Sequence, residues 1–219
     1  MVCRSLWSVK MAESYPLDFP TTVKPSAVRF SAQSVVGIAT SPFSFKQQVF
    51  RHPGERFQAE IALPPMTRAQ AEEFNAFRLR LRGKFGTFLL GDPAGATPRG
   101  TASATPGTPV VNGGSQTGDS LDIDGLPNNE TGYLKAGDYI QLGSGATAQL
   151  HKVLEDVDTN GSGEATLNIY PALRSSPADD ATVVVSNAKG VFRLTSNEMG
   201  WDVGLANYYG VTLAAVEAL

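Results

Sequence analysis

The chain has 219 residues, 42% of them apolar, and a formal net charge of −3, which suffices for one large or two small β domains with a buried core. A single cysteine, Cys3, excludes an internal disulfide framework and a cysteine-based zinc site, and no apolar run reaches the ~18–20 residues of a membrane-spanning helix. Residues 1–95 carry 12 Lys/Arg and 7 Asp/Glu, whereas residues 96–190 carry 5 and 11, so the acidic middle segment is a poor candidate for binding nucleic acid.

Residues 1–14 are predicted to form an N-terminal arm. Met11 opens a second plausible start, and the sequence does not decide whether Met1 or Met11 is the true first residue. Leu6 and Trp7 are apolar side chains that a free arm would leave in water. We therefore expect both residues to pack against a neighbouring subunit.

The next segment is predicted to be an extended lead-in followed by β-strands. Residues 15–25 contain three prolines, which block the backbone hydrogen bonds of a sheet. Pro53 and Gly54 are typical of a tight turn, so residues 51–55 are predicted to join two strands into a hairpin with one dry face. The alternation of apolar and polar residues predicts strands at 27–32 and 56–63, and the apolar runs at 35–39 and 44–50 are further strand candidates.

A single helix is predicted to follow this hairpin. Thr67 and Gln70 have the spacing of a capping box, which marks a helix start. Gly83 is typical of the position just after a helix ends. The apolar stripe that we expect to face the core consists of Phe74, Phe77 and Leu81.

Four cations gather at the end of this helix, and they have two interpretations. The first is a surface for salt bridges between subunits or a channel lining that faces nucleic acid. The second is a solvated helix face whose cations complement the helix dipole. The pattern favours neither. The residues are Arg78, Arg80, Arg82 and Lys84.

The remaining chain predicts a second β module inside the first. Residues 95–118 have the composition of a linker, and the first module resumes near residue 190 with further strand-like runs to residue 219. The predicted fold class is therefore mainly β: a β-sandwich or barrel with one flanking α-helix (15–95 plus 189–219), interrupted by a small antiparallel β-barrel-like domain (96–188). The strands of this second module are predicted at 120–123, 134–142, 148–154, 165–170 and 181–185.

No motif indicates a catalytic residue, a cofactor or a metal. Residues 156–161 match the opening of a calcium-binding loop, but Leu167 stands where that loop needs a bidentate Glu, so a turn is favoured. His52 and His151 have no partner motif. Three aromatic residues could stack sugars, although packing in a core or an interface is favoured. These are Trp201, Tyr208 and Tyr209.

The order of these elements resembles the distal tail and minor tail proteins of long-tailed bacteriophages (siphophages). The resemblance covers about half of the chain, at residues 15–93 and 190–219. It consists of a strand, a capped helix, a glycine-flanked aromatic strand that ends in Asp-Pro, and a terminal strand. The corresponding sequences are FQAEIALP (57–64), TRAQAEEF (67–74), GKFGTFLLGDP (83–93) and AAVEAL (214–219).

The resemblance implies a tail-tube-like fold and a non-enzymatic, structural role in the virion tail, which is assembled in the cytoplasm of the bacterial host. Subunits of this kind form a homo-oligomeric ring, commonly a hexamer, that joins the tail tube protein to the hub, baseplate or tip proteins. The ring encloses the channel through which DNA passes, so transient contact with DNA is implied and contact with a membrane is not. The inserted domain would project outward.

Two other hypotheses remain beside this one. A carbohydrate-binding or receptor-binding tail module could act through the inserted β domain, alone or as part of a ring. A tail-associated hydrolase is disfavoured because the sequence offers no catalytic motif.

Overall fold

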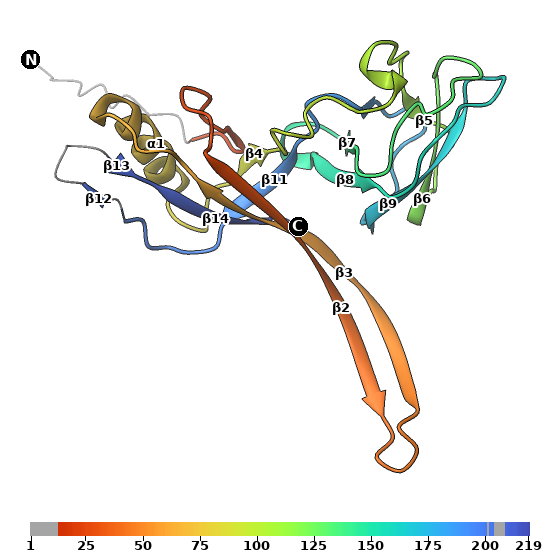
Figure 1. Cartoon of the computed structure of the whole chain (residues 1–219), viewed down its shortest axis with the longest axis horizontal. Helices are drawn as coiled ribbons and strands as arrows, with labels where there is room; N and C mark the ends of the chain where they lie inside the picture. The colour runs from red at the N-terminus through yellow and green to blue at the C-terminus, as the bar shows by residue number, and fades with distance from the viewer. Residues whose placement is uncertain (1–12, 201, 204–208) are drawn as a thin grey trace, which may run out of the picture.

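The computed structural model describes residues 13–200, 202–203 and 209–219 and contains two six-stranded sheets and one α-helix (Figure 1). The host sheet has the strand order β1-β4-β11-β14-β3-β2, and all its pairs are antiparallel except β1 with β4. Its strands are β1 (Leu17–Asp18), β2 (Ala27–Thr40), β3 (Gln47–Ala62), β4 (Phe88–Leu90), β11 (Gly190–Leu194) and β14 (Thr212–Glu217).

The second sheet forms a nearly closed antiparallel barrel, here called the inserted barrel. Its order is β10-β7-β8-β9-β6-β5, and the two ends meet because Val111 N–H donates to Ala181 O (2.9 Å) and Val183 N–H donates to Pro109 O (2.9 Å). Its strands are β5 (Val110–Val111), β6 (Gly118–Asp124), β7 (Tyr139–Leu142), β8 (Gln149–Val153), β9 (Ala165–Leu173) and β10 (Val183–Val184). Two 3₁₀ turns, Thr101–Ser103 and Gly145–Thr147, and a small pair, β12 (Asp202–Val203) with β13 (Tyr209–Gly210), complete the fold.

The predicted fold class is confirmed: the protein is mainly β, with one flanking helix and a small antiparallel barrel-like unit between β4 and β11. The alternation seen in the sequence produces this result. Phe57, Ala59 and Ile61 of β3 are buried, while the residues between them are partly or fully exposed.

Helix α1 (Arg68–Leu81) begins where the capping box predicts it. Gln70 Oε1 accepts hydrogen bonds from the backbone N–H (3.1 Å) and the hydroxyl (3.0 Å) of Thr67. Arg82 and Gly83 both have positive φ and end the helix. The predicted stripe of Phe74, Phe77 and Leu81 is buried and packs on the host sheet.

The predicted turn at residues 51–55 is wrong. β3 runs without interruption through these residues, and the hairpin reverses direction at residues 41–46 instead. Ser34 pairs with Glu55 and Val36 with Arg51, so residues 52–54 stand opposite the single residue Val35. Pro53 needs no ladder hydrogen bond in this bulge, which is why the strand tolerates it.

The hairpin therefore extends well beyond the body of the molecule. Figure 1 shows β2 and β3 leaving the host sheet together as a long two-stranded ribbon. Its distal part, residues 35–54, is here called the arm, and residues 41–46 are its tip.

The inserted barrel is built into the host rather than joined to it only by loops. Tyr139 of β7 and Leu150 of β8 belong to the same buried cluster as the core residues of the host sheet. A Cβ added at Gly190 would lie 2.9 Å from Leu150 Cβ, so β11 and β8 approach each other as closely as a glycine permits. The barrel has a second apolar core of its own, which includes Leu121, Ile140 and Leu167.

Candidate assembly surfaces

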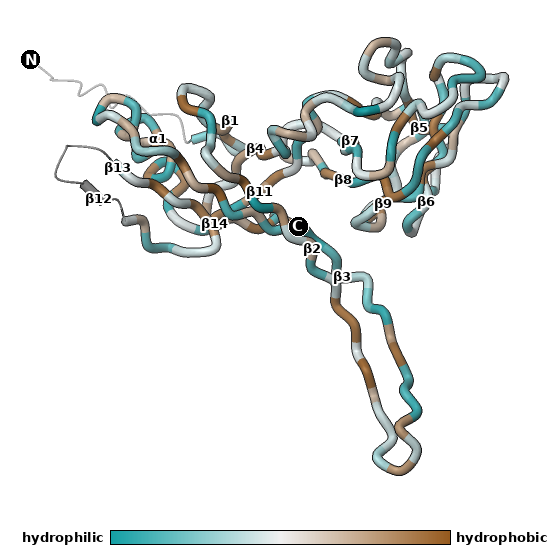
Figure 2. The backbone as a smooth tube through the Cα atoms, in the orientation of Figure 1, coloured by the Kyte–Doolittle hydropathy of each residue, from teal (hydrophilic) through white to brown (hydrophobic). Residues whose placement is uncertain are grey.

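The arm carries the largest set of exposed apolar side chains among the described residues. Phe43 and Phe45 at the tip are 95% and 80% exposed. Directly opposite residues of an antiparallel pair share a face, so the pair Ile38 and Val49 lies on one face together with Val36. Figure 2 shows this surface as hydrophobic stretches along both strands of the arm. The full set is Val35, Val36, Ile38, Phe43, Phe45, Val49 and Phe50.

The arm is also basic. It contains Lys46 and Arg51 and no carboxylate. Arg51 is paired with the carboxylates of Glu55 and Asp119, so the exposed hydrophobic side chains are the feature of the arm that is typical of a surface covered by a partner.

Contacts with the inserted barrel fix the base of the arm. The buried Glu55 carboxylate accepts hydrogen bonds from Arg51 Nη2 (2.9 Å) and from the backbone N–H of Ala172 in β9 (3.1 Å). Tyr170 of β9 donates its hydroxyl proton to Gln33 O (2.9 Å). Strand β9 thus holds β2 and β3 in one direction as they leave the body.

An ion pair strengthens this attachment at the surface. Arg51 Nη1 lies 3.1 Å from Asp119 Oδ2 at the start of β6. The hydrogen bond raises the pKa of the Arg51 guanidinium and lowers the pKa of the Asp119 carboxyl. Both side chains are exposed, so water screens the pair and its main effect is to orient the arm.

The four cations predicted as one cluster at the end of α1 have different environments. Arg78 is buried, its Nη1 donates to Gly200 O (2.9 Å), and burial lowers its pKa. Arg80 Nε donates to Glu13 Oε1 (2.8 Å). Arg82 and Lys84 are exposed. The last two are the members of the cluster whose side chains remain most accessible to a partner.

Leu6 and Trp7, the predicted interface residues of the N-terminal arm, lie outside the described residues. The same holds for Trp201 and Tyr208 among the predicted aromatic platform residues. Tyr209 is described: it is half-buried in β13 and packs against the host core.

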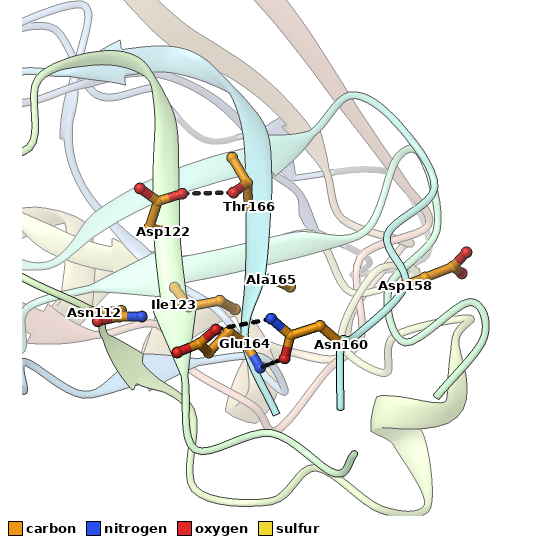
Figure 3. A pocket seen from close by; sticks show the side chains of 8 residues that line it. All are labelled: Asn112, Asp122, Ile123, Asp158, Asn160, Glu164, Ala165 and Thr166. Atoms are coloured by element: carbon orange, nitrogen blue, oxygen red, sulfur yellow. Dashed lines mark hydrogen bonds between the residues drawn. The ribbon is translucent and has the colours of Figure 1, made fainter. Parts of the chain in front are cut away.

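A polar hollow of about 510 Å³ lies on the inserted barrel, beside β6 and the start of β9 (Figure 3). Its acidic groups make bonds within the chain: Thr166 Oγ1 donates to Asp122 Oδ1 (2.6 Å), and Asn160 Nδ2 donates to Glu164 Oε2 (2.8 Å). The residues that line the hollow are Asn112, Asp122, Ile123, Asp158, Asn160, Glu164, Ala165 and Thr166. None of these is aromatic, so the hollow offers hydrogen bonds to a ligand but no stacking surface.

The segment that matches a calcium loop pairs with Leu134 at Val157, is irregular over residues 158–160 and reaches a turn only at Gly161, and its carboxylates bind within the chain. Asp156 accepts from Ala136 N–H (2.9 Å) and pairs with Lys135 Nζ (3.0 Å), and these bonds lower its pKa. Asp158 Oδ1 accepts from Gly132 N–H (2.6 Å). Over residues 13–200, 202–203 and 209–219, no three His, Cys, Asp or Glu side chains converge as metal ligands.

The sequence pattern does not single out the arm as a functional element. The signal was an apolar series, from Val35 to Phe50, that lacks carboxylates and includes two phenylalanines within four residues of a proline. The predicted strands at 35–39 and 44–50 split this series in two. The split hides that the whole series belongs to one ribbon that extends beyond the body of the molecule.

Neither a protein-family model nor a curated protein sequence matches the chain. Among the helices of the described residues, none has the length and apolarity needed to cross a bilayer.

Proposed function

We propose that the protein is a structural subunit that assembles with copies of itself into a ring at the distal end of a siphophage tail. The ring links the tail tube protein to the hub, baseplate or tip proteins and encloses the DNA channel. The protein acts without catalysis, in the virion tail, after assembly in the bacterial cytoplasm. The exposed apolar arm is the observation that carries this proposal, because a surface of this size is unfavourable in an isolated subunit.

The edges of the host sheet also support assembly. β1 at one edge has two residues, and β2 at the other has 14, whose outer side pairs with no other strand among the described residues. Unpaired edges join the sheets of neighbouring subunits when a ring closes, which satisfies their backbone hydrogen bonds. The resemblance of residues 15–93 and 190–219 to siphophage tail proteins specifies which kind of ring we propose.

The purified protein tests the proposal through its mass and shape. We expect mass photometry to give a closed oligomer, six copies being the expected number, and electron microscopy to show rings with a central opening. In phage particles, gold-labelled antibodies against the protein are expected at the distal end of the tail. A protein that stays monomeric at high concentration and is absent from tail particles contradicts the proposal.

The polar hollow favours a second role, recognition of a carbohydrate or another receptor by the inserted barrel. Hydroxyl-rich ligands suit a lining of carboxylates and amides. Deleting residues 96–188 is a poor test, because it removes Tyr139 and Leu150 from the host core. Substitutions Asp122→Asn and Glu164→Gln are better, with Asp180→Asn, an exposed acid outside the hollow, as the matched control. Glycan-array binding that the first two abolish and the third preserves supports this role, and absence of binding by the unmodified protein contradicts it.

A further inference from the structure

The apolar surface of the arm is as large as one side of a stable protein interface. Its seven exposed apolar side chains present on the order of 700 Å² to solvent, whereas each partner of a standard interface buries ~800 Å². A typical monomer's largest apolar patch is ~300–600 Å². Val36, Ile38 and Val49 lie on one face of the ribbon and Val35 and Phe50 on the other, so the two phenylalanines of the tip are where the exposed apolar surface is most concentrated.

The same chain contains an apolar groove that suits the tip. It has a volume of about 600 Å³ and lies between the lead-in, β4 and the junction with the inserted barrel. Its charged members are Lys24, Asp92 and Lys189. The apolar residues that line most of it include Phe19, Val23, Val28, Leu89, Pro93 and Ala188.

An arm cannot fill the groove of its own subunit. Figure 1 shows the arm pointing away from the body, with its tip at the far end from β4, which borders the groove. The hydrogen bonds of Glu55 and Tyr170 to the opposite elements hold the ribbon in this direction. Since a subunit's own arm cannot reach its groove, we take the arm of a second copy of the chain as the occupant of that groove.

We propose that Phe43 and Phe45 of one subunit insert into the groove of the next. This contact rests on the proposed function and identifies how neighbouring subunits bind each other. An apolar cavity of ~150 Å³ accommodates a benzene ring, so a groove of about 600 Å³ has room for both phenyl rings.

Arm-to-arm pairing fits less well. Two arms side by side would bring the Lys46 side chains of both tips close together, whereas Arg51 is already paired with Glu55 and Asp119 of its own chain. The contact between tip and groove is heterologous, because two different surfaces meet; such a contact closes a ring when the rotation between neighbouring copies divides a full turn and gives an open filament when it does not. The inferred contact is therefore compatible with the architecture proposed above.

The backbone of the tip is consistent with a docking role. Phe45 has φ of 54°, a left-handed conformation that is unfavourable for an aromatic residue. Hydrogen bonds hold it: Phe45 N–H donates to Ser41 O (3.0 Å) and Ser41 N–H donates to Lys46 O (2.9 Å). A glycine or asparagine would relieve this strain, and the phenylalanine instead keeps its ring in water, where only a partner can cover it.

Disulfide cross-linking tests the contact directly. In a Cys3→Ser background, Ser44→Cys places a thiol between the two tip rings, and Thr21→Cys places one at the exposed groove wall. We expect a cross-linked dimer when the two variants are mixed, none when either is oxidised alone, and a ladder from the chain that carries both. Dimers from Ser44→Cys alone indicate arm-to-arm pairing and overturn the inference.

Sedimentation of the double variant F43A/F45A measures what the tip contributes. Both side chains are exposed, so the fold is retained, as circular dichroism will verify, and we expect the dissociation constant of self-association to rise at least ~100-fold. The matched control is Phe85→Ala, which removes a phenylalanine that is 74% exposed but lies outside the arm, and should leave the dissociation constant unchanged.

These experiments distinguish a failure of the proposed contact between tip and groove from a failure of the proposed ring. Assembly that survives F43A/F45A, with no cross-link between Ser44→Cys and Thr21→Cys, overturns the contact while the proposed function stands. Unmodified protein that never self-associates overturns both. Flotation of the protein with vesicles of phosphatidylcholine and phosphatidylglycerol, lost in F43A/F45A, overturns the contact, because it assigns the tip to a lipid surface.

Discussion

At the scale of single residues, His151 is the buried titratable group whose pKa most affects how the stability of the fold depends on pH. It is fully buried in β8, and its Nδ1 lies 2.7 Å from the Pro171 carbonyl oxygen. Within the part of the chain that the structure describes, its Nε2 has no hydrogen-bond partner. Desolvation, together with the charge of Arg174, lowers the pKa of His151 from 6.5 to about 4, although the bond to Pro171 opposes the shift. The folded protein therefore keeps the imidazole neutral.

This lowered pKa predicts acid sensitivity. The unfolded chain binds a proton near pH 6.5 and the folded chain only near pH 4, so the free energy of unfolding falls as the pH decreases between these values, by about 3 kcal/mol in total. Urea unfolding at pH 7 and pH 4.5 is expected to show a smaller decrease for His151→Leu than for the unmodified protein. The matched control is His52→Gln, at the other histidine, which is exposed. If the free energy of unfolding falls equally with pH in His151→Leu and in the unmodified protein, His151 is not the source of the acid sensitivity.

Glu217 provides a second test at this scale. Its carboxylate, 1% exposed, accepts hydrogen bonds from Arg174 and from the backbone N–H of Phe57 (3.0 Å), and so joins the residue that follows β9 of the barrel to β14 and β3 of the host sheet. Removing one partner of a buried pair leaves the other charge uncompensated. We expect Glu217→Ala to lower the free energy of unfolding by about 3–5 kcal/mol, measured by urea denaturation.

The control for Glu217 is Glu60, whose pair with Arg29 is exposed on both sides. Glu60→Ala should cost less than about 1 kcal/mol. If Glu217→Ala and Glu60→Ala lower the free energy of unfolding by similar amounts, the buried ion pair contributes no more to stability than the exposed one.

At the scale of elements, α1 is the part of the fold that the sequence predicts best. Its start, its end and its buried stripe all depend on residues close in sequence, namely the pair Thr67 and Gln70, the apolar spacing and Gly83. Such local signals are sufficient for a helix because its hydrogen bonds join residues four apart. The sequence predicts the strands at 118–124, 149–153 and 165–173 nearly as well, since each is a short run with apolar residues that is bounded by turn residues.

Phe77 tests how much the helix contributes. Its ring contacts Phe19 and Phe88 at centroid distances of 5.7 and 5.5 Å, and it is buried. We expect Phe77→Ala to cost about 3–5 kcal/mol in thermal or urea unfolding. Leu79, on the exposed face of the same helix, is the control, and Leu79→Ala should cost less than about 0.5 kcal/mol. A loss below 1 kcal/mol for Phe77→Ala would contradict this packing role.

The hairpin of β2 and β3 illustrates why the length and position of some strands cannot be predicted from the sequence. Pro53-Gly54 and Ser41-Pro42 are both turn signals, and only the length over which β2 pairs with β3 decides between them. That length depends on the bulge opposite Val35 and on contacts from Tyr170 and Ala172, more than 110 residues away in sequence. The exposure of the arm follows from the same distant contacts, so the sequence alone could not identify it as a candidate site.

At the scale of the whole molecule, the two sheets share one core at their junction. Leu150 is fully buried there although it belongs to the inserted barrel. We expect Leu150→Ala to cost about 2–5 kcal/mol and, in hydrogen-exchange mass spectrometry, to raise exchange in host peptides 57–63 and 212–217 as well as in the barrel.

The control for this effect is Leu154→Ala, just after β8, where the side chain is largely exposed. It should leave exchange in the host peptides unchanged. If Leu150→Ala alters exchange in the barrel alone, the two sheets unfold independently and the shared core does not couple them.

The place where the chain leaves and re-enters the host sheet has a consequence for the evolution of the protein. Leu90 and Gly190 are direct partners in the pair of β4 with β11, so the two ends of the inserted segment are separated by only about 5 Å. A short reverse turn could span that gap, and so could any compact module with adjacent termini. Replacing the inserted barrel by another module at this position would preserve the host sheet, provided that the new module also supplies two large side chains. These side chains would take the places of Tyr139 and Leu150 and cover the face of the sheet that the barrel now buries.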